Sequence, residues 1–375
     1  MRCIVKVGII LVLTLFIPLN ATFATSTKDI SQDVQLNNII DELNKYTEDL
    51  DLKDISENLL AGEGLEYESI FKKIVGIIKE ALISSVKQVL LILVFVVTVS
   101  ALKALELDKD GTISKVANMF TVFVVILYLL GVYSEYVTLV KDIVNVQSNI
   151  VQIVSPFLMS MLILTGAITT VGIIQPLILF IVQLICFSVN SIAIPLLTVS
   201  IVFNIVTCLS DKINFEKLGS MCNKTALWIN TIFLTIFLGV VSLGTTVSTS
   251  VDDITIKATQ TAVSSVIPVV GKFVSDSVEF VMGATELISK TAGVVALIVL
   301  VMVVISPLIR IGITALVTSI VTAIAESINA DKQVVTMLDK FSSVFKTMLG
   351  VAISTSVTFI ISIATMMSIV SKIVE

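Results

Sequence analysis

The chain contains no histidine, and only 14% of its 375 residues are charged. Without histidine, Ser–His and Cys–His catalysis, histidine-ligated zinc and histidine pH switches are all excluded. The nearest approach to a phosphate-binding loop is Gly271-Lys272, which lacks the upstream glycine and the following hydroxyl residue. We therefore expect no enzymatic activity, no cofactor and no metal site.

Cysteine is scarce too. The four cysteines are Cys3, Cys186, Cys208 and Cys222, and none belongs to a C-x-x-C pair, so we expect free thiols rather than a disulfide framework. The net charge of −5 argues against a basic nucleic-acid-binding surface.

Long uncharged runs fill most of the remaining sequence, of which 56% is hydrophobic. A membrane-spanning helix needs about 20 mainly apolar residues, and soluble cores do not repeat blocks of that length. We therefore predict an all-α polytopic membrane protein with about seven to nine transmembrane helices. The uncharged runs are Val89–Leu102, Val116–Tyr133, Asn145–Ser210, Ala226–Val251 and Thr291–Ile309.

Residues 1–24 have the pattern of a cleavable signal peptide. Arg2 and Lys6 precede thirteen mostly apolar residues, 7–19, and Thr22-Phe23-Ala24 supplies small residues at the expected cleavage site. Thirteen residues are too few to span a bilayer, although an uncleaved anchor is the alternative. Cleavage would leave the mature N-terminus outside the cytoplasm.

Residues 25–80 are acidic and amphipathic. Between Thr25 and Ile70, twelve Asp and Glu face three Lys, a net charge of −9, while apolar residues such as Ile39, Ile40 and Leu43 recur at helical spacing. We predict two or three helices outside the cytoplasm, which form either a solvated cap or an acidic docking surface for a partner.

The membrane part divides into a first helix group at 81–250, an amphipathic interfacial or re-entrant segment at 251–290, and a second group at 291–375. Tight connections are expected near Thr169-Thr170 and Asn190-Ser191, a short outer loop at 134–149, and a hairpin turn at Pro307 and Arg310. The expected spans are 86–104, 115–133, 150–170, 173–190, 192–209, 226–247, 291–308, 311–327 and 344–371.

Within 251–290, five residues at spacings of three and four form one helical stripe. We interpret it either as the lining of an aqueous path or a partner-binding surface, or as the polar face of a helix lying in the head groups. The stripe consists of Asp276, Glu279, Gly283, Glu286 and Lys290.

Three ladders of small or hydroxyl residues recur at four-residue intervals. The first, Thr314, Thr318, Thr322 and Glu326, is a candidate polar seam, although such threonines commonly bond to their own helix. The other two favour close helix packing. They are Gly350, Ser354, Thr358 and Ser362, and Thr231, Thr235 and Gly239.

Isolated polar residues inside apolar runs are costly in lipid and should face protein or water. These are Gln183, Asn190, Asn204 and Asn230. Arg310, the only arginine outside the leader, is expected to anchor a cytoplasmic turn.

Four short segments, together with the leader, the acidic segment and the polytopic body, resemble the stage III sporulation protein AE family of endospore-forming bacteria. The segments are Thr235–Val240, Ile254–Lys257, Ile267–Lys272 and Lys290–Gly293. The resemblance implies a multi-pass subunit, in the mother-cell membrane around the forespore, of a secretion-like channel that joins the two cells and sustains late forespore gene expression.

The resemblance further implies other channel subunits as partners, among them a separate ATPase, and it supplies no catalytic residues. Self-association of this chain is a further possibility. The alternative from another class is a stand-alone permease for a small solute, with a polar site near Asn190, Asn204 and Thr318. An enzyme acting on lipid is the weakest alternative, because the sequence shows no acid–base or nucleophile constellation.

Overall fold

The computed structural model describes residues 34–47, 51–61, 71–84, 86, 90, 94, 112–209, 214–266, 268–328 and 330–374. Side chains are described for these residues except at 34–35, 112–118, 121, 242–281 and 372–374. The predicted signal peptide, 1–24, and most of the first predicted span, 86–104, lie outside the described residues.

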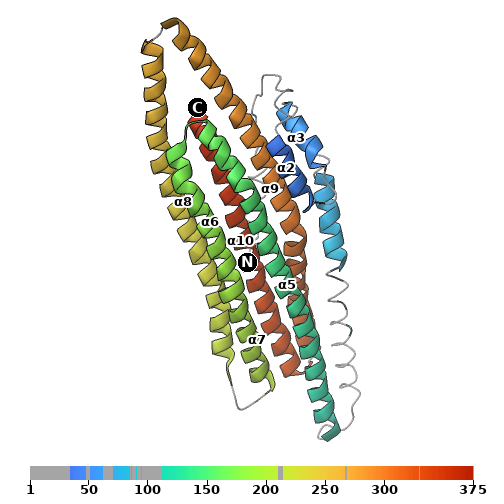
Figure 1. Ribbon diagram of the computed structural model, residues 1–375. Coiled ribbons are helices and arrows are strands. Elements are labelled where there is room, and N and C mark those ends of the chain that lie inside the picture. The colour runs from blue at the N-terminus through green and yellow to red at the C-terminus, as the bar shows by residue number, and fades with distance from the viewer. Residues whose placement is uncertain are drawn as a thin grey trace.

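The described residues form an all-helical structure, which confirms the predicted class. The main body is an up-and-down bundle of long helices (Figure 1). Its helices are α5 (Thr112–Leu164), α6 (Ile168–Phe187), the π-helix η1 (Ser188–Ala193), α7 (Ile194–Leu209), α8 (Glu216–Val266), α9 (Pro268–Ser327) and α10 (Lys332–Val374).

Helix α10 is the axis of this bundle, because it packs against α5, α7, α8 and α9. The ring of Tyr136 of α5 packs edge-on against Phe345, and Gln147, further along α5, is within hydrogen-bonding distance of Ser356, so α5 runs parallel to α10. By contrast, Ser319 of α9 meets Ser342 while Glu286 meets Ser371, so α9 is antiparallel to α10.

Among the described residues, five helical segments are long and apolar enough to cross a membrane, so the chain has the character of a membrane protein, while the predicted count of seven to nine is not confirmed. The segments are Val122–Leu164, Ile168–Leu209, Glu216–Val241, Met282–Ser327 and Lys332–Ser371. Expected spans have merged in pairs into helices much longer than one crossing. In α5, for example, the expected outer loop at 134–149 is helical, because this stretch contains neither glycine nor proline to end the helix.

The turn between α5 and α6 lies at Gly166, three residues before the predicted connection at Thr169-Thr170. Gly166 has φ of 86°, its N–H donates to Ile163, and the N–H of Ala167 donates to Leu162. This is the Schellman arrangement, in which a left-handed residue after the helix satisfies its last carbonyl groups, and glycine adopts that conformation without steric cost.

The predicted connection at Asn190-Ser191 is wrong, because the chain continues there as η1 and enters α7 without turning. The N–H of Ile194 donates to the carbonyl of Val189, five residues back. Pro195 follows immediately and has no N–H to donate, so the ordinary helical ladder would be interrupted at this place in any case. A π-turn absorbs the mismatch while keeping the chain helical.

The predicted hairpin at Pro307 and Arg310 is also wrong, because both residues lie inside the continuous helix α9. Proline in a helix removes one hydrogen bond and bends the axis, but it does not reverse the chain. Between Gly293 and Gly312 no glycine is available for a left-handed turn.

The predicted interfacial segment 251–290 forms the end of α8 and the beginning of α9, which together project beyond the other helices (Figure 1). Helix α9 starts at Pro268, a residue suited to a first helical position. The acidic segment contains α2 (Val34–Asn44) and α3 (Leu52–Leu60), which pack against α9 through buried residues such as Leu36, Ile40 and Leu52.

Candidate functional site

The most concentrated polar contacts between described residues lie along the interface of α8 and α10. The side-chain amide of Asn230, which is 3% exposed, donates to the carbonyl of Val351 at 3.2 Å and to Thr355 Oγ1 at 3.2 Å, and it also contacts Ser354 Oγ. An amide inside an apolar helix pair is stabilised only when such partners are present. Asn230 therefore fixes α8 against α10.

Two further contacts of this interface lie at intervals of seven residues along α8. Asn223 donates to Ser343 Oγ at 3.1 Å, and Glu216 accepts from Lys340 Nζ at 2.6 Å. The partners on α10 follow in the same order as Glu216, Asn223 and Asn230 on α8, so these helices are parallel. A seven-residue repeat keeps one side of α8 facing its partner over several turns.

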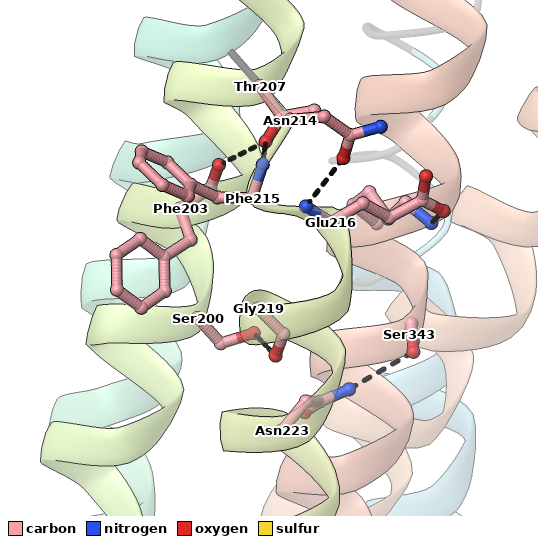
Figure 2. A network of polar contacts seen from close by, with 10 residues as sticks. Ser200, Phe203, Thr207, Asn214, Phe215, Glu216, Gly219, Asn223 and Ser343 are labelled. Carbon is pink, nitrogen blue, oxygen red and sulfur yellow. Dashed lines mark hydrogen bonds and ion pairs between the residues drawn. The ribbon is translucent and has the colours of Figure 1, made fainter.

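The corner between α7 and α8 is the second part of this polar network (Figure 2). Thr207 Oγ1 accepts from the N–H of Phe215 at 2.9 Å, and Asn214 Oδ1 accepts from the N–H of Glu216 at 3.0 Å. Both contacts satisfy backbone N–H groups at the start of α8, which have no partner within the helix. The Phe203 and Phe215 rings pack with centroids 5.4 Å apart.

Close approach of the two helices at this corner depends on Gly219. Ser200 Oγ donates to the carbonyl of Gly219 at 2.7 Å, and a Cβ at position 219 would lie 2.7 Å from Asn204 Oδ1 (Figure 2 shows Ser200 and Gly219). Any larger residue would force Asn204 away. The glycine thereby allows α7 and α8 to pack backbone against side chain.

The predicted stripe at 276–290 is described only in part. Glu286 forms an ion pair with Lys290 and accepts from Ser371 Oγ of α10 at 3.1 Å. Gly283 is exposed, and a Cβ added at this position would have no neighbouring atom within 4 Å. Asp276 and Glu279 lie in α9, but their side chains are outside the described residues.

The predicted polar seam follows one face of α9 from the interior to the surface. Thr314 and Thr318 are fully buried, whereas Glu326 is exposed. Thr318 and Thr322 donate to the carbonyl groups four residues earlier, at 2.6 and 2.8 Å. Their hydroxyl groups are thus satisfied within α9.

The two small-residue ladders lie in different surroundings. Gly350 and Ser354 of α10 face α8, where a Cβ at Gly350 would come within 2.9 Å of Leu227 Cδ1, while Thr358 and Ser362 are buried and bond to their own helix. By contrast, Thr231, Thr235 and Gly239 are exposed on the outer face of α8, so this ladder has no packing partner in the described part of the chain.

The isolated polar residues also differ in their surroundings, since some are buried and others are exposed. Asn204 is buried beside Gly219, and Asn190 has a buried Oδ1 without a hydrogen-bond partner among the described residues. Gln183 is exposed on the outer face of α6. Arg310 is half-buried within α9, and its Nε has no hydrogen-bond partner in the described structure.

Tyr136 and Gln147 are among the interior polar residues that were not predicted from sequence. Tyr136 of α5 places its hydroxyl 2.6 Å from Thr314 Oγ1, and Gln147 is completely buried with its Oε1 3.4 Å from Ser356 Oγ. Gln147 lies within the uncharged run Asn145–Ser210, and a polar residue inside such a run was the signal that could have identified it. For Tyr136 no sequence signal existed, because tyrosine is common at membrane boundaries.

Chemically, these contacts join helices rather than form a reaction centre. No group of three or more cysteine or acidic residues that could hold a metal occurs in the part of the chain that the structure describes. The described cysteines, Cys186, Cys208 and Cys222, are free thiols.

Comparison with known proteins agrees with the resemblance of the sequence segments. A relative from Bacillus subtilis (strain 168), stage III sporulation protein AE, is 24% identical over 203 residues, which cover 54% of this chain and about half, 51%, of the relative. No solved structure matches the chain. Residues 50–370 match the sequence profile of stage III sporulation protein AE, and the chain therefore belongs to this family.

Proposed function

We propose that the chain is an integral-membrane subunit of the secretion-like channel that links mother cell and forespore and sustains late forespore gene expression. Family membership over residues 50–370 is the observation that carries this proposal. The proposal includes the location of the chain in the mother-cell membrane around the forespore, with the mature N-terminus outside the cytoplasm. It also includes a separate ATPase among the partners.

The architecture supports a subunit that acts by assembly. Polar contacts between helices hold neighbouring helices together: Asn230 links α8 to α10, and Ser200 links α7 to α8. Long helices locked in this way form a stiff body on which other subunits can dock.

Two surfaces outside the cytoplasm are proposed as docking surfaces for these subunits: the acidic segment 25–80 and the projecting segment 251–290. At the base of the second surface, Glu286 is held by Lys290 and Ser371. The stripe with Asp276, Glu279 and Gly283 is proposed to meet a partner or to line the conduit.

The proposal is tested first by an in-frame deletion in the spore-forming host, scored by a forespore reporter after engulfment is complete. Arrest at that stage with normal vegetative growth is the expected result. Normal sporulation, or a growth defect relieved by a nutrient, would contradict the channel role and favour a solute permease.

The docking surface is tested separately by charge reversal at Asp276, Glu279 and Glu286. We expect impaired assembly or transport in the triple variant, whereas Asp142→Lys, at an exposed position of α5, should leave sporulation intact. Full activity of the triple variant would remove the stripe from the proposal.

A further inference from the structure

The continuous helix formed by α6, η1 and α7 is longer than a bilayer can cover. Residues Ile168–Leu209 comprise 42 residues without a charged side chain. At 1.5 Å per residue, this helix is about 63 Å long, whereas the hydrocarbon core of a bilayer is about 30 Å thick. Lipid tails therefore cover at most about half of it.

The outer face of this helix is mainly apolar over both halves, and Gln183, Ser191 and Thr198 are its exposed polar residues between Phe180 and Val202. Exposed side chains recur every three or four residues from α6 into α7, so they form one stripe. Phe180 and Phe187 are exposed on the α6 half, and Val199, Val202 and Leu209 on the α7 half.

Charged side chains lie at the level of the α7 half. Cys208 of α7 donates to the carbonyl of Gln333, and since α7 and α10 are antiparallel, Val202 lies about level with Asp339. Asp339 and the neighbouring ion pair of Lys340 with Glu216 are charged, and Asp339 is exposed. Exposed charges at this level are incompatible with lipid tails.

A second apolar stripe lies at the same level on α9. Leu316, Ile320, Ile324 and Ile328 are exposed at intervals of four residues, and the contact of Ser319 with Ser342 places Ile320 about level with Phe341. Helices α7 and α9 both pack against α10, but they share no extended contact with each other. The two stripes therefore belong to separate sides of the bundle.

We propose that the α7 stripe of one copy of this chain packs against the α9 stripe of a second copy, outside the bilayer. Two copies in one membrane stand at the same height and in the same orientation, so the stripes with Val202 and Ile320 meet at the same level. Both are uncharged along their length, and burying them together removes apolar surface from water. Contact between two different faces is head-to-tail, and when the rotation closes it generates a ring.

Cysteine cross-linking tests this contact in membranes that contain the full-length chain with its four native cysteines replaced. Two differently tagged copies carry Val202→Cys and Ile320→Cys, respectively, and we expect a cross-linked pair with both tags. Phe180→Cys with Ile320→Cys is the matched control and should give none, since Phe180 lies in the lipid-covered half. Cross-linking of Val202→Cys only with itself would indicate a two-fold contact and overturn the proposal.

Tryptophan quenching by brominated lipid decides what covers the stripe. The chain has one tryptophan, Trp228, so Val202→Trp and Phe180→Trp are each placed in a Trp228→Phe background and purified into vesicles. We expect several-fold stronger quenching at position 180 than at 202. Equal quenching at the two positions would show that lipid covers α7. Weak quenching at position 202 without a cross-linked pair would show that no second copy covers it. Either result overturns the proposal.

Discussion

Tyr136 of α5 and Thr314 of α9 lie 178 residues apart in the sequence, and their hydroxyl oxygens are 2.6 Å apart in the interior of the bundle. Both side chains are almost completely buried. This hydrogen bond connects two helices that run in opposite directions on one side of α10.

Removing either hydroxyl should destabilise the bundle. We expect Tyr136→Phe and Thr314→Val each to lower the free energy of unfolding by about 1 kcal/mol, the usual contribution of a buried hydrogen bond. The double variant should cost less than the sum, because both changes remove the same interaction. Denaturant titration in detergent measures this, with Thr138→Val as the exposed control; strictly additive losses would mean that the two hydroxyls do not interact.

Asn230 should contribute more than an average polar residue. Its amide has three acceptors on α10, so Asn230→Leu should lower stability by about 1–2 kcal/mol and loosen α8 from α10. The adjacent Thr231→Val is the matched control, since Thr231 is exposed and its hydroxyl donates to the carbonyl of Leu227 in its own helix. Thermal unfolding in detergent compares the two, and equal midpoints would contradict the assigned role of Asn230.

Gly293 allows α9 and α10 to approach, so Gly293→Ala should be destabilising. A Cβ there would lie 2.3 Å from Met367 Cγ, and we expect a loss of about 1–3 kcal/mol. The double variant Gly293→Ala/Met367→Ala, in which the neighbouring side chain is shortened, should recover part of the lost stability. Gly131→Ala is the control: no atom lies within 4 Å of its Cβ, so it should be neutral or raise stability by up to about 1 kcal/mol.

The contact between α2 and α3 should weaken as the pH rises under alkaline conditions. The hydrogen bond and attraction from Asp41, 2.8 Å away, raise the pKa of Lys53 above its ordinary value. Because folding raises the pKa of Lys53, the ion pair stabilises the folded state at pH values below the ordinary pKa of lysine. This contribution is lost as the pH rises through the pKa of Lys53 in the folded state. Hydrogen exchange of α2 and α3 should therefore accelerate at alkaline pH, and less so in Lys53→Met; identical pH dependence in both would contradict the ion pair.

Much of the architecture followed from sequence patterns. The uncharged runs predicted an all-helical membrane protein, because only helices satisfy every backbone group within lipid in a chain of this kind. The position of the first turn was predicted to within a few residues, since Gly166 lies nearby. The predicted turns at Asn190-Ser191 and Arg310 were wrong, because polar and proline residues were taken as chain reversals when helices tolerate both.

The candidate site was less accessible from sequence. Asn230 was singled out as an amide that needs a partner, but nothing in the sequence identified Val351, Ser354 and Thr355 as that partner. Likewise, the ladder at Gly350 and the ladder at Thr231 have the same spacing, yet one is packed against α8 and the other is exposed. Spacing along a helix defines a face, but not what that face contacts.

The sequence by itself determined that this chain is helical, apolar and without a visible catalytic constellation, because these properties depend on composition and local periodicity. Only the tertiary structure decided that α10 lies at the centre, that α8 is parallel to it, and that the outer stripes with Val202 and Ile320 share one level. Such relationships depend on which of several similar helix faces pack together. That choice depends on the summed fit of side chains distant in sequence, such as Tyr136 with Thr314 and Gly293 with Met367.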